Sequence, residues 1–258
     1  MKFLKKSYIY LTFIFLYAPI LILVIYSFND SKFRGRWGGF SLRWYREMLN
    51  DGDIMRALYN TLLIALISSV VATIIGTFAT IGIHFMKGKI KNIIMNITYI
   101  PVISPDIIIG ISLMLLFLFV RIPVGFWTIV LAHITFNIPF VILSVMPKLK
   151  QLSPHLFEAA EDLGASSFYT FRKVILPEIW SGILNGLLLS ITLSIDDFVV
   201  SFFTKGAGVS TLSVLIYAMA RKGINPSINA LSTIMFVSVL TMLIIINFRT
   251  KDDDVLNN

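Results

Sequence analysis

Long apolar stretches are the feature that most restricts how this chain can fold. Six of them follow one another along the sequence, at residues 8–27, 60–86, 92–120, 122–147, 179–204 and 223–248. Four carry no charged residue; the third contains Asp106 and the fifth contains Asp196 and Asp197. A helix needs about 20 mostly apolar residues to cross a lipid bilayer. The sequence therefore predicts an all-α, polytopic membrane protein with six transmembrane helices.

The composition supports this class and excludes several others. Of the 258 residues, 57% are hydrophobic and 14% are charged, whereas a soluble domain carries about 25% charged residues. A soluble fold of this length could not cover so much apolar surface. The chain has no cysteine, which excludes disulfides, thiolate metal sites and cysteine nucleophiles. His84 and His133 are expected to pack within the bundle and show no metal-ligand spacing, so we expect no metal and no cofactor.

The basic residues are expected to set topology rather than to bind nucleic acid. The net charge is +8, but no basic helix or aromatic–basic module stands out. Lys and Arg gather in the loops of membrane proteins, mostly on the inner side. With the N-terminus inside, the inner segments hold 12 of these residues and the outer segments hold 10. This narrow difference does not decide the orientation by itself.

The N-terminal part, residues 1–58, is predicted to hold one membrane helix and an external segment. The apolar run at 8–27 is too long for a signal-peptide core and no A-x-A site follows, so we expect it to be retained as an anchor. After it, Ser41 can cap a short helix, and Trp44 and Tyr45 suit the headgroup layer. This helix could lie at the membrane interface or pack on the bundle as an ordinary surface helix.

Proline and glycine interrupt the third stretch. Pro101, Pro105 and Gly110 follow one another closely. Such breaks are tolerated where neighbouring helices or a water-filled cavity satisfy the freed backbone groups. The stretch could be a helix that bends beside a pathway, or it could contain a simple kink or a late helix start.

The segment 148–178, between the fourth and fifth stretches, looks folded rather than extended. Ser153 and Pro154 are a helix start signal, and Gly164 is a helix stop. Small and apolar residues line one face of the helix between them. Phe168 and its neighbours suggest a second short helix, and Pro177 marks the beginning of the fifth span. Because a solvated loop would not need an apolar face, this segment needs a partner or a pocket.

This segment resembles the EAA loop of ABC-importer permeases. The pattern of that family is E-A-A, three residues, G, nine residues, I-x-L-P, and every spacing is kept, with Val174 in place of isoleucine. The resemblance implies a cytoplasmic loop that docks on an ATPase subunit, and hence both termini in the cytoplasm. The residues implied in docking are Glu158, Ala159, Ala160, Gly164, Leu176 and Pro177.

The resemblance extends over nearly the whole chain. Residues 56–65 are similar to the opening of the type-1 transmembrane domain, and residues 194–203 resemble a segment of spermidine/putrescine permeases of the shorter, C-type kind. This implies a type-1 domain over 59–248, a cytoplasmic tail at 249–258, and a place in the bacterial inner membrane. It also implies polyamine import with a second, different permease, two ATPase subunits and an external substrate-binding protein. The chain has no G-x-x-x-x-G-K-[ST] motif with which to hydrolyse ATP itself.

The aspartates within the apolar stretches are the candidate substrate-pathway residues. An aspartate at mid-bilayer costs about 2.5–3.5 kcal/mol, and adjacent helical residues point about 100° apart. At least one of Asp196 and Asp197 should therefore face the interior or a cavity, where a carboxylate could meet an ammonium group and the ring of Phe198 could add cation–π attraction. Alternatively, one of them caps a broken helix or pairs with a basic residue. Asp106 suits a helix cap near a membrane face or a place on the pathway.

Three other functions are alternatives to polyamine import, and the sequence argues against them to different degrees. A permease of the same family could carry iron, sulfate or a phosphonate, and sequence separates this alternative least well. A secondary transporter would have no evident use for the segment 153–177. An intramembrane enzyme would need a nucleophile–base pair or a motif such as H-E-x-x-H, and the sequence offers neither.

Overall fold

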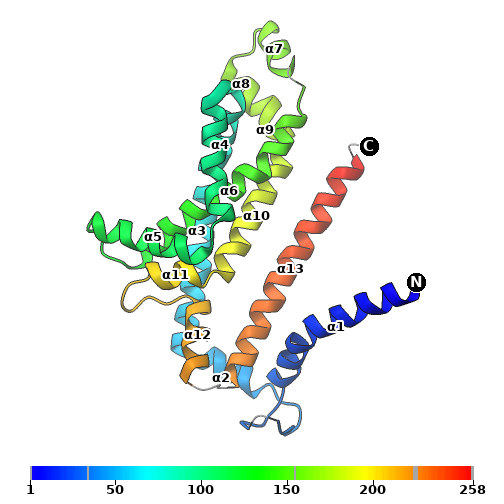
Figure 1. The fold of residues 1–258 in the computed structure, drawn as a ribbon, viewed down its shortest axis with the longest axis vertical. Helices are drawn as coiled ribbons and strands as arrows, with labels where there is room; N and C mark the ends of the chain where they lie inside the picture. The colour runs from blue at the N-terminus through cyan, green and yellow to red at the C-terminus, as the bar shows by residue number, and fades with distance from the viewer. Residues whose placement is uncertain (1, 34, 154, 223–225, 257–258) are drawn as a thin grey trace. The chain divides into compact units, whose positions relative to one another are not determined.

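The computed structural model describes residues 2–33, 35–153, 155–222 and 226–256. Within these ranges the chain is almost entirely helical, and the only strand-like pairing is a single bridge between Asn29 and Phe40. The helices, shown in Figure 1, are α1 (Lys2–Ser27), α2 (Arg43–Asn50), α3 (Gly52–Phe85), α4 (Gly88–Ile103), α5 (Asp106–Phe119), α6 (Phe126–Gln151), α7 (His155–Asp162), α8 (Ser167–Thr170), the π-helical turn η1 (Phe171–Ile175), α9 (Leu176–Glu178), α10 (Trp180–Asp196), α11 (Val199–Thr204), α12 (Leu212–Lys222) and α13 (Ser227–Leu256).

The helices confirm the all-α, polytopic prediction. Four are long and apolar enough to cross a membrane: α1 from Ser7, α3, α6, and α13 as far as Ile244. Two further spans are bent pairs, α4 with α5 and residues 167–178 with α10. Counting each bent pair as one span gives six. The chain also divides into two compact units, residues 1–57 with 215–241 and residues 58–214 with 242–258, which are described separately below.

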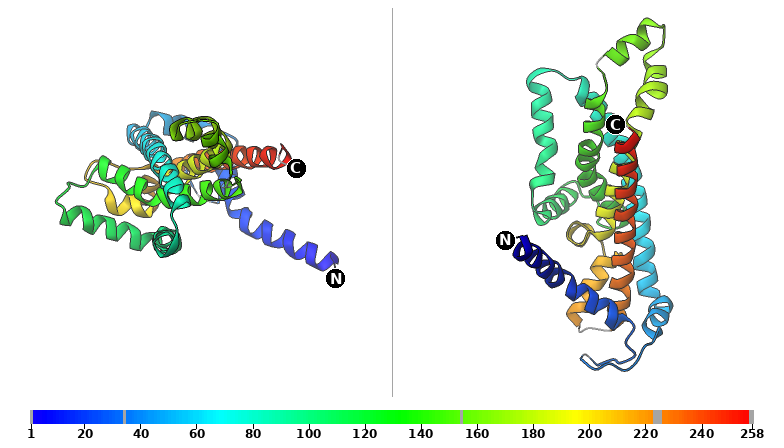
Figure 2. Two further views of the ribbon diagram at one scale, coloured as in Figure 1. Left: turned by 90° about the horizontal axis from the view of Figure 1, so that it is seen from above. Right: turned by 90° about the vertical axis from the view of Figure 1, so that its right-hand side faces the viewer.

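The third predicted stretch, 92–120, is not one continuous helix. α4 ends at Ile103, α5 begins at Asp106, and the two axes differ by 108°. Figures 1 and 2 show α5 running across the direction of α4. Ser104 and Pro105 have extended backbones, with ψ of 143° and 136°. A proline disfavours the α conformation in the residue before it, so Pro105 explains why α4 ends here. The stretch is therefore two helices with a sharp break at Pro105.

The second unit is organised around α6. Its side chains Val141, Val145 and Leu149 form a buried cluster with Ile175 and Ile179. α10 lies along α6 (Figure 1), and glycines allow the close approach. A Cβ at Gly182 would lie 3.0 Å from Ser144 O, and one at Gly186 would lie 3.3 Å from Val141 Cα. α3 approaches the same helix at Gly76, where a Cβ would come within 2.7 Å of Val141. Small residues therefore bring three helices together here.

The first unit places Trp44 differently from the expectation. α2 does form, but its N-cap residue is Leu42 and not Ser41, whose hydroxyl accepts a hydrogen bond from Arg43 N at 3.1 Å from one position before the cap. However, Trp44 is only 1% exposed, and its Nε1 donates to Asn29 O at 2.6 Å. Tyr45 pairs with Ser27 through their hydroxyls at 2.7 Å. Trp44 is thus a packed residue of this unit and not an anchor in the headgroup layer.

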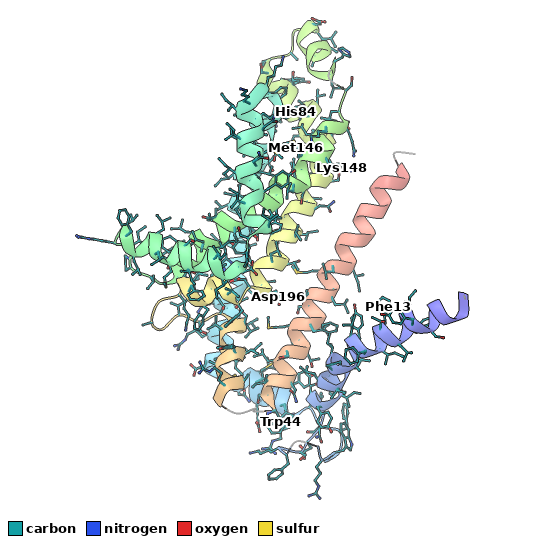
Figure 3. All side chains as sticks on the ribbon, in the orientation of Figure 1. Phe13, Trp44, His84, Met146, Lys148 and Asp196 are labelled. Atoms are coloured by element: carbon teal, nitrogen blue, oxygen red, sulfur yellow. The ribbon has the colours of Figure 1, made fainter. Side chains whose placement is uncertain are left out.

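In contrast to the buried Trp44, the apolar side chains of α1 are exposed. None of its apolar window is buried, and rings such as Tyr8 and Phe15 are 72% and 80% exposed. Figure 3 shows the side chain of Phe13 on the same helix. An apolar helix without protein cover is stable in a lipid environment. α1 therefore fits the predicted membrane anchor.

Candidate functional site

The candidate site is a cavity at the point where the fifth apolar stretch breaks. α10 ends at Asp196, α11 begins at Val199, and the cavity beside this break has a volume of about 320 Å³. The four candidate pathway residues all line it, together with residues of α4, α5 and α6. The lining residues are Pro101, Val102, Asp106, Ile109, Phe136, Phe140, Thr192, Leu193, Asp196, Asp197, Phe198, Val199 and Val200.

Asp197 holds the first turn of α11. Its Oδ1 accepts from Val200 N at 3.1 Å, and its Oδ2 accepts from Ser201 N at 2.7 Å. The same Oδ2 lies 3.3 Å from His133 Nε2, and the side chain is only 9% exposed. The structure thus shows the capping geometry that was one of the two alternatives for the aspartate pair. Satisfying the orphan N–H groups of a broken helix with a carboxylate lowers the cost of the break.

Asp196 and Asp106 have different surroundings from Asp197. Both side chains are exposed, both line the cavity, and neither accepts a hydrogen bond from the described part of the chain. Asp106 comes from the first turn of α5 and Asp196 from the last turn of α10. The bend after Pro105 therefore brings a second carboxylate to the cavity, and this pair is free to meet a ligand.

Aromatic rings close part of the cavity wall. Phe198 is half-buried at the break itself, and its ring centroid lies 5.5 Å from that of Phe202. Phe136 and Phe140 contribute from α6. A cavity with carboxylates and ring faces suits an organic cation better than an anion.

Side chains of α3 and α12 hold the segments around the break in place. Ser213 Oγ donates to Asp197 O at 2.6 Å. Next to it, Thr61 Oγ1 accepts from Leu212 N at 2.8 Å, and Asn60 Nδ2 donates to Ser210 O at 3.1 Å. The sequence carries no signal for Ser213, and for His133 it indicates no more than a packing role. The one sequence feature that could have predicted a buried polar partner for His133 is its position in a stretch, 122–147, that has no charged residue.

The segment 148–178 folds as a helix, a glycine stop and a second helical part. Gly164 has φ of +79°, and Ala165 N donates to Ala160 O at 3.0 Å, the six-residue closure of a Schellman motif. His155 N is 3.4 Å from Ser153 Oγ, as a cap predicts. Pro154 and the side chain of Glu158 lie outside the described residues. Figure 3 shows Lys148, where α6 approaches this segment, well apart from Asp196.

The predicted docking residues separate into two groups. Ala160 and Gly164 line a surface pocket of about 540 Å³. Ala159 is exposed beside it, and Leu163, which also lines it, is 89% exposed. Leu176 packs on the buried cluster around Ile175, and Pro177 is exposed within α9. An exposed apolar side chain next to a small-residue pocket is typical of a surface that a partner covers.

The second helical part consists of three short pieces, α8, η1 and α9. α8 starts at Ser167, capped by the Ser166 hydroxyl, which accepts from Tyr169 N at 3.3 Å. Pro177 lies within α9, and α10 starts only at Trp180 after a bend of 67°. Pro177 therefore lies just before the straight part of the fifth span, near the beginning that it was predicted to mark.

Comparison with known proteins identifies the family to which the chain belongs. Residues 72–250 match the family described as the binding-protein-dependent transport system inner membrane component. The chain belongs to this family. It is therefore a multi-pass permease of the bacterial inner membrane. The permease is 37% identical over 251 residues, 97% of its length and 95% of the relative's, to the spermidine/putrescine transport system permease protein PotC of Escherichia coli K12. It is 41% identical over 237 residues to the putrescine transport system permease protein PotI of the same strain, covering 89% of the permease and 84% of PotI.

Solved structures agree on the fold. A bacterial ABC transporter involved in alginate import superimposes with a TM-score of 0.70 at 16% identity, over 98% of the permease and 94% of that chain. An amino acid ABC transporter gives 0.60 at 17% identity, over 80% and 95%. The resemblance to ABC-importer permeases is thus confirmed, and the type-1 permease fold with it.

Proposed function

We propose that this permease forms part of the membrane pathway of an ATP-driven importer for polyamines. The observation that carries the proposal is the cavity at the α10–α11 break, where Asp106 and Asp196 present exposed carboxylates beside aromatic rings. Relatives named for spermidine and putrescine transport support the same substrate class. A polyamine is a flexible chain of ammonium groups, and carboxylates are its natural partners.

The two carboxylates would lower the cost of taking an ammonium group out of water. The membrane potential draws a cation inward by about 2.3 kcal/mol per charge per 100 mV, so the pathway does not need to bind tightly. Asp106 and Asp196 replace part of the hydration of one ammonium group at a time. Phe198 adds cation–π attraction. Asp197, whose oxygens already accept two backbone hydrogen bonds, contributes its charge from a fixed position.

The remaining parts of the proposal concern the partners. A second, different permease would complete the pathway, an external binding protein would deliver the substrate, and two separate ATPase subunits would hydrolyse ATP. The surface around Ala160 and Gly164, with Glu158, Ala159, Leu176 and Pro177, would dock an ATPase. The type-1 domain would span 59–248, with 1–58 as the anchor and external segment and 249–258 as a cytoplasmic tail.

Uptake measurements test the substrate class. A strain lacking its own polyamine importers would receive the complete system, and uptake of labelled spermidine and putrescine would be compared with that of iron, sulfate and a phosphonate. We expect uptake of at least one polyamine and none of the other solutes. Uptake of an anion in place of a polyamine would contradict the proposal, because the exposed carboxylates would repel it.

The orientation can be tested with single cysteines, since the native chain has none. We propose that both termini and the segment 148–178 lie in the cytoplasm. Ser167→Cys should then resist an impermeant thiol reagent added to intact cells and react after the cells are opened. Ser31→Cys, in the predicted external segment, is the matched control and should react in intact cells. Labelling of Ser167→Cys from outside would reverse the orientation.

A further inference from the structure

Behind the cavity wall, His133 links α6 to the break between α10 and α11. The side chain is fully buried, and its Nε2 lies 3.3 Å from Asp197 Oδ2 and 3.0 Å from Ser201 Oγ. Its ring packs edge-on against Phe136, with centroids 5.1 Å apart. Phe136 and Asp197 line the cavity and His133 does not. His133 can therefore influence the cavity only through these neighbours.

The contact with Asp197 favours a proton on Nε2 of His133. An ionised carboxylate can only accept hydrogen bonds, so Nε2 must donate for the contact to be attractive. Nδ1 is buried and has no hydrogen-bond partner in the described part of the chain. With the proton on Nε2, the buried and unpaired Nδ1 is an acceptor and not an N–H donor. In this arrangement the Asp197 carboxylate accepts hydrogen bonds from Val200 N and Ser201 N, and the Nε2–H of His133, which is shared with Ser201 Oγ at 3.0 Å, lies 3.3 Å from Oδ2.

The adjacent Asp196 has no such donors, and this difference suggests a division of roles. We propose that His133 is a positioning residue of the pathway: it holds the Asp197 carboxylate in its capping orientation, so that a passing cation meets Asp197 as a fixed charge and Asp196 as a movable ligand. This inference rests on the proposed function. A fixed carboxylate attracts an ammonium group but cannot turn to wrap it, which keeps binding weak and release fast.

Removing the donor should alter transport in a recognisable way. In His133→Leu, Asp197 loses the N–H that lies beside Oδ2 and can turn toward the cavity, where it holds the cation longer. The maximal uptake rate should fall about tenfold, the size expected when one polar contact to a charged group is lost. The half-saturating concentration should stay the same or fall. His133→Gln can still present an N–H to Asp197, so its rate should stay within about twofold of the wild type.

A double-mutant cycle separates this role from simple packing. Uptake would be measured for the complete transporter with His133→Leu and His133→Gln, each alone and combined with Asp197→Asn, normalised to the amount in the membrane. Because the asparagine side chain lacks the charge that His133 orients, the leucine substitution should cost less than about twofold in that background.

Three results would overturn the proposal. They are normal uptake by His133→Leu, an equal loss in both backgrounds, and a glutamine variant as slow as the leucine variant. A failure of the proposed function would appear separately, as absence of polyamine uptake by the wild type. The same cycle would then be measured with the solute that the wild type does carry, and the same three results would decide.

Discussion

Replacing Gly164 with arginine should nearly abolish transport while the permease still inserts in the membrane. Two effects act together. Gly164 has φ of +79°, a conformation that costs a side-chain-bearing residue about 1–2 kcal/mol. No atom lies within 4 Å of a Cβ built there, so the permease itself has room for a side chain.

The arginine would instead project from the pocket surface shared with Ala160 and Leu163, which we propose an ATPase covers. Burying an unpaired charge in that interface should lower transport more than a hundredfold, about 3 kcal/mol or more.

Matched variants separate the two effects. Gly208 has φ of +82° and the same open space, but it lies between α11 and α12. Gly208→Arg therefore introduces similar backbone strain outside the proposed docking surface and should leave ATPase association unchanged. Gly164→Asn tolerates the left-handed conformation and should retain most transport. Co-purification of the ATPase and substrate-stimulated ATP hydrolysis are the measurements. If Gly164→Arg keeps both at wild-type levels, the segment does not dock the ATPase.

Removing the two exposed carboxylates should have the second large effect. Asparagine is nearly isosteric with aspartate, so Asp196→Asn and Asp106→Asn test charge rather than shape. Each change should lower polyamine uptake about tenfold, and the double variant should lose uptake almost completely, since a charge-assisted hydrogen bond contributes about 1.5–3 kcal/mol. Because both side chains are exposed and accept no hydrogen bond from the described residues, the amount of folded permease should not change.

Asp197 provides the contrast on the adjacent position. Asp197→Ala removes the acceptor for Val200 N and Ser201 N and should destabilise the first turn of α11 by about 0.5–2 kcal/mol. Its main result should be less permease in the membrane. Uptake and membrane abundance would be measured for all variants together. Normal polyamine uptake by the Asp106/Asp196 double variant would show that these carboxylates are not on the pathway. The cavity would then no longer support a cationic substrate.

The sequence by itself determined the class of the protein and several local features. The apolar stretches predicted the membrane helices because hydropathy over about 20 residues depends on composition alone. Ser153 and Gly164 predicted the ends of α7, and Pro105 indicated a break, because caps and proline act on their immediate neighbours. The spacing around Glu158 and Gly164 carried the family resemblance, since it is a pattern along the chain.

Only the tertiary structure decided how neighbouring residues differ in role. The sequence gives no basis for distinguishing Asp196 from Asp197. In the structure, Asp196 is exposed to the cavity, whereas Asp197 caps α11 beside His133. Trp44 seemed suited to the headgroup layer but is buried against Asn29. His133 and Ser201 lie 68 residues apart and meet within 3.0 Å. Hydropathy and capping signals lie within one continuous stretch of the chain, whereas these environments depend on which helices pack together. The direction a side chain faces, and the donors it meets, exist only once α6, α10 and α11 have assembled.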